Sequence, residues 1–305
     1  MSSPNWFSFQ WWKLTHPRRN RQRQDVIAHA RASGVFDDDP DMREIVEHLE
    51  SAPIDTFPYA YRYRYIANRS PASFDAEHGL HYVTHNGRRL YWHPQRNPKR
   101  IPADHASLLS EQDERSPHRY LASDFDVGEG DIIADVGCAE ANFTLDVIDR
   151  IRHAYLFETD PRWITALQAT FAPWKDKVTI VQALVGRESI GDTIALDNYF
   201  ADKAPPTFLK LDVEGHEAEV LQGAAGIIRS SAELRAAVCT YHRQEDLEDL
   251  TALLQGMGME VQPSRGYMLL HRSDEFEPPY FRRGLVRARF NQPASPTTAD
   301  GSIGS

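Results

Sequence analysis

The architecture of this 305-residue chain follows from the stretch Asp131-Ile-Ile-Ala-Asp-Val-Gly-Cys-Ala-Glu-Ala-Asn-Phe-Thr-Leu145. Its apolar start predicts a strand, and Gly137 predicts a tight turn. Asn142, a residue type favoured at helix N-caps, predicts where a helix begins. A second apolar run, Ala154-Tyr-Leu-Phe-Glu158, ends in an acid 23 positions after Asp135. This spacing is typical of a βαβ unit whose second acid binds the hydroxyl groups of a ribose.

Further along the chain, a second strand-to-helix transition is rich in acids. The segment Phe208-Leu-Lys-Leu-Asp-Val-Glu-Gly-His-Glu-Ala-Glu-Val-Leu-Gln-Gly-Ala224 places Asp212, Glu214 and Glu217 directly after an apolar run. Ligands bind at the carboxyl ends of strands in α/β sheets, and buried acids are costly without a partner. The segment therefore predicts a site for a cation, a metal or a proton transfer. The alternative is a solvated turn whose acids the helix N-terminus favours, and we expect a structural role for His216.

Strand and helix patterns alternate from about residue 130 onward, which predicts a parallel sheet with right-handed crossovers. The expected strands are 132–136, 154–158, 178–181, 207–212 and 235–241, and the expected helices are 143–151, 161–171, 216–229 and 244–256. The strand patterns at 259–263 and 267–272, joined by 264–266, predict a closing antiparallel hairpin.

Several motifs in this order resemble the FkbM family of S-adenosylmethionine-dependent methyltransferases. The resembling parts are Asp135-Val-Gly-Cys-Ala-Glu-Ala-Asn-Phe143, Phe157-Glu158, Thr193-Ile-Ala-Leu-Asp197, Lys210-Leu-Asp-Val-Glu-Gly-His-Glu217, Val220-Leu-Gln-Gly-Ala224 and Cys239-Thr-Tyr-His-Arg243. They extend over about residues 120–290. The resemblance implies an α/β, Rossmann-like methyltransferase fold, with a mostly parallel sheet closed by the antiparallel C-terminal hairpin.

The same resemblance implies S-adenosylmethionine as the cofactor. The residues expected to bind it are Asp135, Gly137, Cys138, Ala139, Glu140, Asn142, Glu158 and Asp160. A dinucleotide would demand glycines for close approach to its pyrophosphate, but alanines stand at positions 139 and 141. S-adenosylmethionine carries no phosphate, and its sulfonium cation suits a pocket lined by acids. A nicotinamide-dependent oxidoreductase is the lesser alternative.

Methyl transfer to an alcohol requires removal of the hydroxyl proton by a base or a metal. Asp212 and His242 end adjacent expected strands, and Glu214 lies on the same side of the turn. We expect these three residues to be catalytic. One histidine with two carboxylates would also suit Mg²⁺ or Mn²⁺, so the same three residues are candidate metal ligands. A structural imidazole is the alternative for His242.

The chain is acidic overall: 34 Lys and Arg against 44 Asp and Glu give a formal net charge of −10. We therefore expect no nucleic acid among its partners. Two cysteines, Cys138 and Cys239, argue against a disulfide scaffold. No apolar run approaches the roughly 18 residues of a membrane span, and no signal-peptide core is visible, so we expect a cytoplasmic protein.

We expect residues 1–115 to form an N-terminal aromatic and basic segment with an α+β cap. Residues 116–290 would form the methyltransferase domain, and residues 291–305 a disordered tail. Within the cap, helices are expected at 24–33 and 41–50, a strand at the alternating tyrosines of 59–65, and a hairpin around Asn86-Gly87. The aromatic and arginine-rich residues 1–23 would pack on the protein body. The alternative is peripheral contact with the inner face of a membrane.

These expectations together indicate an O-methyltransferase that acts on a hydroxyl of a glycan, in a surface polysaccharide or a sugar-containing product. The glycan is implied only by the resemblance. The rival is a non-catalytic methyltransferase-like module that binds a glycan or a partner. The oligomeric state stays open.

Overall fold

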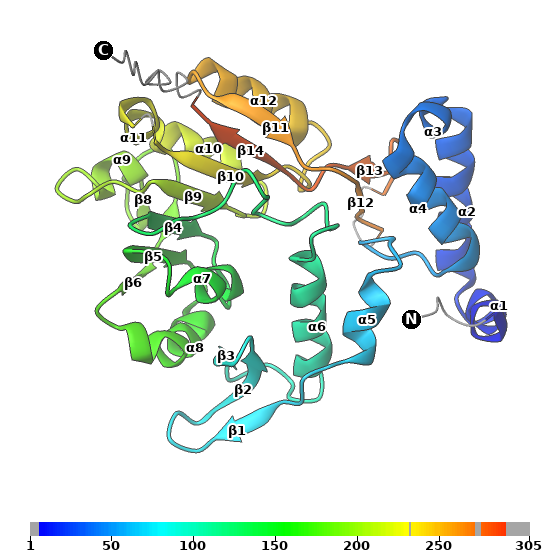
Figure 1. Ribbon diagram of the computed structural model, residues 1–305, viewed down its shortest axis with the longest axis horizontal. Coiled ribbons are helices and arrows are strands. Elements are labelled where there is room, and N and C mark those ends of the chain that lie inside the picture. The colour runs from blue at the N-terminus through cyan, green and yellow to red at the C-terminus, as the bar shows by residue number, and fades with distance from the viewer. Residues whose placement is uncertain (1–5, 232, 272–275, 291–305) are drawn as a thin grey trace, which may run out of the picture.

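The computed structural model describes residues 6–231, 233–271 and 276–290. Its centre is a seven-stranded sheet with the order β11-β14-β10-β9-β4-β5-β6 (Figure 1). The strands are β4 (Ile132–Val136), β5 (His153–Glu158), β6 (Val178–Gln182), β9 (Phe208–Leu211), β10 (Arg235–Cys239), β11 (Glu260–Pro263) and β14 (Leu285–Arg289). Only β14 runs against its neighbours β10 and β11. The expected Rossmann-like methyltransferase fold is thereby confirmed.

Helices cover both faces of this sheet because its strands are apolar on both sides. Ile133 and Ala134 of β4 belong to different hydrophobic clusters, as do Phe208 and Leu209 of β9. One cluster includes side chains of α7 (Asn142–Val147) and α8 (Pro161–Phe171). The other includes side chains of α10 (Glu217–Gly223), α11 (Ala225–Ser230) and α12 (Asp246–Gly256). Continuous burial on both faces is typical of parallel strands.

The expected helix 216–229 is divided into α10 and α11. A Cβ atom on Gly223 would lie only 2.0 Å from the carbonyl oxygen of Gly186, so glycine permits this close approach of the two segments. The shorter elements of this half are η1 (Ala172–Trp174), β7 (Leu184–Val185), β8 (Thr193–Ile194) and α9 (Leu196–Tyr199).

The predicted hairpin between 259–263 and 267–272 is wrong. Strand β11 pairs instead with β14, which follows it by more than twenty residues. The intervening chain forms β12 (Met268–Leu269) and β13 (Phe281–Arg282), a separate two-stranded sheet. Met268 and Leu269 are buried among cap residues such as Ile45 and Leu49, so the apolar run that suggested a sheet strand fills the core of the cap.

The N-terminal part is mainly helical and lies to one side of the sheet (Figure 1). Its elements are α1 (Trp6–Thr15), α2 (Pro17–Ala32), α3 (Val35–Asp38), α4 (Pro40–Ser51), α5 (Arg62–Ala67), β1 (Ser73–Asp75), β2 (Leu80–His85), β3 (Arg88–Trp92) and α6 (Ile101–Glu111). The two expected helices and the hairpin are confirmed; Asn86 and Gly87 hold φ angles of 48° and 81° in its turn. The expected strand over 59–65 is wrong, because its second half begins α5, and Tyr59 and Tyr61 are buried and stacked.

The division at residue 115 stays a prediction, although Met268 and Leu269 of β12 pack into the core of the cap. The expected disordered tail at 291–305 lies outside the described residues, as do residues 1–5. Across the described part of the chain, no helix combines the length and the apolar character needed to cross a membrane.

Candidate functional site

The turn after β4 touches the turn after β9. Gly137 has a φ angle of 70°, and a Cβ atom there would lie 2.0 Å from the carbonyl oxygen of Asp212. The backbone N–H of Gly137 donates to the carbonyl of Phe157 at 3.0 Å, which ties the turn to β5 as well. Glycine is therefore required both by the left-handed backbone and by the contact with Asp212.

Two alanines in this turn also adopt left-handed backbone angles. Ala139 and Ala141 have φ angles of 47° and 55°, which cost a residue with a Cβ atom roughly 1 kcal/mol each. Ala141 is the N-cap of α7, one position before the expected cap Asn142, which is instead the buried first residue of the helix. Glu158 holds the turn, because its Oε2 atom accepts the N–H of Ala139 at 2.8 Å.

Asp135 is buried in an ion pair below the turn. Its Oδ1 atom lies 3.1 Å from Nζ of Lys210, and its Oδ2 atom accepts from the hydroxyl of Thr144 at 2.7 Å. Lys210 also donates to the carbonyl of Gly137 at 2.7 Å. Burial alone would lower the pKa of Lys210, but the charges of Asp135 and Asp212 raise it above its ordinary value. The ammonium group thus links the two turns electrostatically.

The other expected cofactor residues lie around the same turn. Cys138 and Glu140 are buried, and burial raises the pKa of Glu140 to about 8. Asp160 is the N-cap of α8, where it accepts from the backbone N–H of Arg162 at 2.9 Å. The hydrogen bonds of the Arg162 side chain and backbone lower the pKa of Asp160 to about 2. Whether these residues bind a cofactor stays a prediction.

Asp212, at the end of β9, is the centre of a polar cluster. Two phenols donate to its carboxylate: Tyr241 Oη to Oδ1 at 2.9 Å, and Tyr120 Oη to Oδ2 at 3.0 Å. Two imidazoles lie at ion-pair distance. Nε2 of His242 is 3.5 Å from Oδ1, and Nε2 of His118 is 3.5 Å from Oδ2. The two sides of the carboxylate therefore have equivalent environments, each with one phenol and one imidazole.

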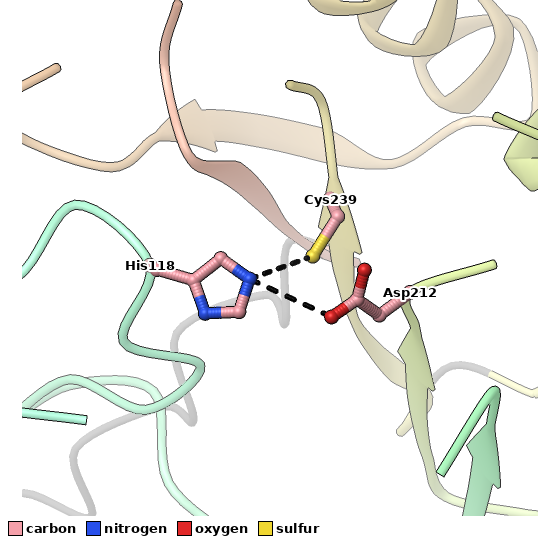
Figure 2. Close-up of side chains that lie close together, drawn as sticks. All are labelled: His118, Asp212 and Cys239. Carbon is pink, nitrogen blue, oxygen red and sulfur yellow. Dashed lines mark hydrogen bonds and ion pairs between the residues drawn. The ribbon is translucent and has the colours of Figure 1, made fainter. Parts of the chain in front are cut away.

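Figure 2 shows one side of this cluster, where the ring of His118 points at both Asp212 and Cys239. Nε2 of His118 lies 3.6 Å from Sγ of Cys239. Burial raises the pKa of the Cys239 thiol far above its ordinary value, and the negative charge of Asp212 adds to this effect. The thiol is therefore protonated at neutral pH and inert as a nucleophile.

Electrostatics fix the charge of Asp212. Burial on its own would raise the pKa of Asp212, but hydrogen bonding from His118 and the charge of Lys210 hold it far below its ordinary range. Burial and the neighbouring carboxylate raise the pKa values of Tyr120 and Tyr241. Both phenols are therefore hydrogen-bond donors at neutral pH, and neither can serve as a base.

His242 follows β10 and has a second carboxylate partner. Its Nδ1 atom lies 2.9 Å from Oε1 of the buried Glu217, and its Nε2 atom lies 3.6 Å from Oε2 of Glu214, whose side chain is 92% exposed. Burial alone would lower the pKa of His242. The hydrogen bond and charge of Glu217, together with Asp212 and Glu214, outweigh burial and raise it above the ordinary value of 6.5.

The expected catalytic residues thus converge, with one difference in the candidate metal set. Glu217, not Glu214, forms with Asp212 and His242 a group whose ligand atoms all lie within 4.8 Å of one another. A second such group consists of His118, Asp212 and Cys239. Glu217 was expected among the acids of the strand-to-helix turn, but not among the catalytic residues. His118, Tyr120 and Tyr241 were not predicted. Tyr241 lies inside a recognised motif and could have been included, whereas His118 and Tyr120 lie in a loop without periodicity.

Comparison with known proteins gives one family. The profile described as "Methyltransferase FkbM domain" matches residues 147–266. No curated protein matches the chain significantly.

One similar solved structure is a methyltransferase FkbM from Methylobacillus flagellatus KT. The two chains are 19% identical, and the alignment covers 62% of this chain and 52% of that chain with a TM-score of 0.43. The chain therefore spans about half the length of that protein. Trm5b from Pyrococcus abyssi has 13% identity, with 72% and 62% covered and a TM-score of 0.40. An rRNA methylase from Streptococcus thermophilus has 14% identity, with 54% and 90% covered and a TM-score of 0.39.

At these scores the solved structures say nothing about the substrate of the chain. The family match, by contrast, spans the strand ends that carry Asp212 and His242. Residues 147–266 are identified as a methyltransferase domain of the FkbM family.

Proposed function

We propose that the protein is an S-adenosylmethionine-dependent O-methyltransferase that acts on a hydroxyl group of a glycan. The observation that carries this proposal is the arrangement of Glu217, His242 and Asp212 beside the turn at Gly137. It combines a partly buried imidazole, two carboxylates and a tight glycine turn at the end of a parallel strand.

The residues around the turn fit the cofactor. Ala139 and Ala141 hold left-handed backbone angles that shape the turn, and Glu158 offers a carboxylate at the end of β5 for ribose hydroxyls. Gly137 leaves no room for a side chain between this turn and Asp212. When bound, S-adenosylmethionine would supply an activated methyl group on its sulfonium. Residues 137–142 and Glu158 would hold it.

His242 would remove the proton of the acceptor hydroxyl. If Nδ1 carries the proton that faces Glu217, Nε2 has a free lone pair on the side of Asp212 and Glu214. Nε2 of His242 would take the hydroxyl proton as the hydroxyl oxygen accepts the methyl group that the cofactor supplies. Glu217 and Asp212 would stabilise the imidazolium that results.

A divalent ion is the second way to activate the hydroxyl. Asp212, Glu217 and His242 offer two carboxylates and one imidazole within 4.8 Å, a donor set that suits Mg²⁺ or Mn²⁺. An ion held there would lower the pKa of the hydroxyl without a protein base. Glu214 is placed at the rim of this group by its distance of 3.6 Å from His242.

A glycan is supported as acceptor by the family resemblance and by the acidic charge balance, which disfavours nucleic acid. A non-catalytic glycan- or partner-binding module is the rival. The grouping of His242 with Asp212 and Glu217 favours the enzyme, because an imidazole held between two carboxylates has the environment of a catalytic base.

Calorimetry and turnover test the proposal together. S-adenosylhomocysteine should bind the wild type, and Glu158→Ala should weaken it by roughly 1.5–3 kcal/mol, the scale of hydrogen bonds to a charged group. The exposed Glu188→Ala is the matched control and should bind normally. Release of S-adenosylhomocysteine is then measured with a panel of sugars. Tight NAD binding without S-adenosylhomocysteine binding would overturn the cofactor assignment, and cofactor binding without turnover on any acceptor would favour the binding module.

A further inference from the structure

One face of α1 carries three exposed apolar side chains. Phe7 is 77% exposed, Trp11 67% and Leu14 80%. Their spacing of four and three residues places them on a single stripe of the helix. Isolated exposed apolar residues are ordinary, whereas a contiguous stripe marks a surface used for binding. We call Phe7, Trp11 and Leu14 the outer stripe.

The opposite face of α1 is packed against the protein. Phe9 is 5% exposed, its ring is stacked with that of Trp12 at 6.0 Å, and the guanidinium of Arg23 lies 5.1 Å from its centroid. Trp12 also packs against the cap core. The orientation of the helix is therefore fixed by its inner face. The expectation that the aromatic residues cover the protein body holds for Phe9 and Trp12, but not for the outer stripe.

Positive charge lies next to the outer stripe. The first 24 residues contain five Lys and Arg and no Asp or Glu, so the remaining 281 residues carry a net charge of −15 (29 − 44). Arg18 and Arg21, at the start of α2, are exposed. Figure 1 places α1 at the outer edge of the cap, away from the seven-stranded sheet. An apolar stripe flanked by cationic side chains is thus presented at one end of an otherwise acidic molecule.

We propose that the outer stripe and the first turns of α2 form a docking surface for an anionic lipid membrane. Aromatic and aliphatic side chains of this kind enter the boundary between headgroups and acyl chains, while arginines meet the lipid phosphates. A nucleic acid would use the arginines but not the exposed Leu14 and Phe7. This surface is carried by α1 and α2 alone, so it is independent of the methyl transfer.

Vesicle sedimentation of the full-length protein tests the surface. The wild type should bind vesicles made of equal parts phosphatidylcholine and phosphatidylglycerol, and bind phosphatidylcholine vesicles weakly. Trp11→Ser with Leu14→Ser should lower partitioning at least about tenfold. Arg18→Gln with Arg21→Gln should lower it about 30-fold on the anionic vesicles only, since each cation near such a surface contributes a similar electrostatic factor. Binding should weaken with salt.

Phe74→Ser with Ile190→Ser is the matched control, because these residues are 59% and 69% exposed elsewhere on the molecule. It should bind like the wild type. Quenching of tryptophan fluorescence by brominated lipid tests the unsubstituted protein directly. Equal partitioning of all variants, absence of quenching, or a stripe-dependent dimer in light scattering without vesicle binding would each overturn the proposal.

Discussion

Oε1 of Glu217 lies 2.9 Å from Nδ1 of His242, and the same oxygen accepts the backbone N–H of Val213 at 2.9 Å. Glu217 begins α10, whereas His242 follows β10. One buried carboxylate therefore fixes both the histidine and the backbone beside Asp212. In the proposed mechanism Glu217 is a positioning residue, since it would act on the reaction through the orientation and basicity of His242.

The first prediction concerns pH. Because Glu217 and Asp212 raise the pKa of His242 above 6.5, the rate should fall with decreasing pH through a midpoint above 6.5, where the base becomes protonated. Glu217→Gln removes the charge, so the midpoint should move to lower pH and the plateau rate should fall about tenfold or more. Glu219→Gln, on the same helix, is the control. An unchanged midpoint in Glu217→Gln would remove this carboxylate from the proton transfer.

The raised pKa of His242 also predicts how the stability of the fold depends on pH. A histidine whose folded pKa is raised stabilises the fold fully below its unfolded pKa of about 6.5. This contribution is lost as the pH rises through the folded pKa. The difference in the free energy of unfolding between wild type and His242→Ala, measured with denaturant, should therefore decrease as the pH rises through the folded pKa.

The second prediction distinguishes a mechanism in which His242 is the base from one in which a divalent ion activates the hydroxyl. His242→Ala should lower the rate by about 10²-fold or more while S-adenosylhomocysteine still binds. His216→Ala, an exposed histidine at the start of α10, should leave the rate unchanged. If an ion activates the hydroxyl, EDTA should stop turnover and Mg²⁺ or Mn²⁺ should restore it. Activity that survives EDTA leaves His242 as the base, and normal turnover of His242→Ala would contradict both versions.

The buried ion pair below the turn predicts a large loss of stability. Lys210→Met leaves Asp135 charged and without its partner at 3.1 Å, which should cost about 3–5 kcal/mol in the free energy of unfolding. Lys203→Met removes an exposed pair with Asp202 and should cost less than about 1 kcal/mol. Chemical denaturation of the two variants makes the comparison. Similar losses would mean that burial does not govern the strength of these pairs.

The contact between the turns after β4 and β9 predicts that adding a single side-chain methyl group at Gly137 is destabilising. Gly137→Ala places a Cβ atom against the carbonyl of Asp212, in addition to the strain of a positive φ angle. We expect a loss of about 2–5 kcal/mol and loss of S-adenosylhomocysteine binding. Gly130→Ala has the same backbone demand with open space around it, so it should cost about 1 kcal/mol and bind normally. Normal cofactor binding by a folded Gly137→Ala variant would separate this turn from the cofactor site.

Local periodicity was sufficient to predict the sheet, because its strands are apolar on both faces and its helices carry apolar stripes. It failed where a distant segment decided the conformation. Met268 and Leu269 resemble a hairpin strand, but their side chains fill the cap. The tyrosines at 59–65 alternate like a strand, yet α5 begins at Arg62.

The sequence predicted the residues of the candidate site that lie at strand ends, but not those that lie in the loop between α6 and β4. Asp212 and His242 meet because parallel strands end at the same edge, a rule that the sequence pattern already contains. His118 and Tyr120 reach Asp212 from the irregular chain between α6 and β4. Arg287 holds that loop through the carbonyl of Tyr120 at 3.0 Å, a contact between residues 167 positions apart that no local pattern encodes.

The excursion of the chain between β11 and β14 connects the cap to the candidate site. After β11 the backbone leaves the sheet, inserts Leu269 into the cap and returns through Arg282. The guanidinium of Arg282 donates to the carbonyls of Tyr241 and His242 at 2.8 Å and 2.7 Å. A load applied to the cap, such as attachment to a surface, would thus be transmitted to the backbone of the histidine through one continuous set of packed and hydrogen-bonded groups. In the proposed mechanism, attachment of the cap to a surface would then alter the position of His242 and with it the rate of methyl transfer.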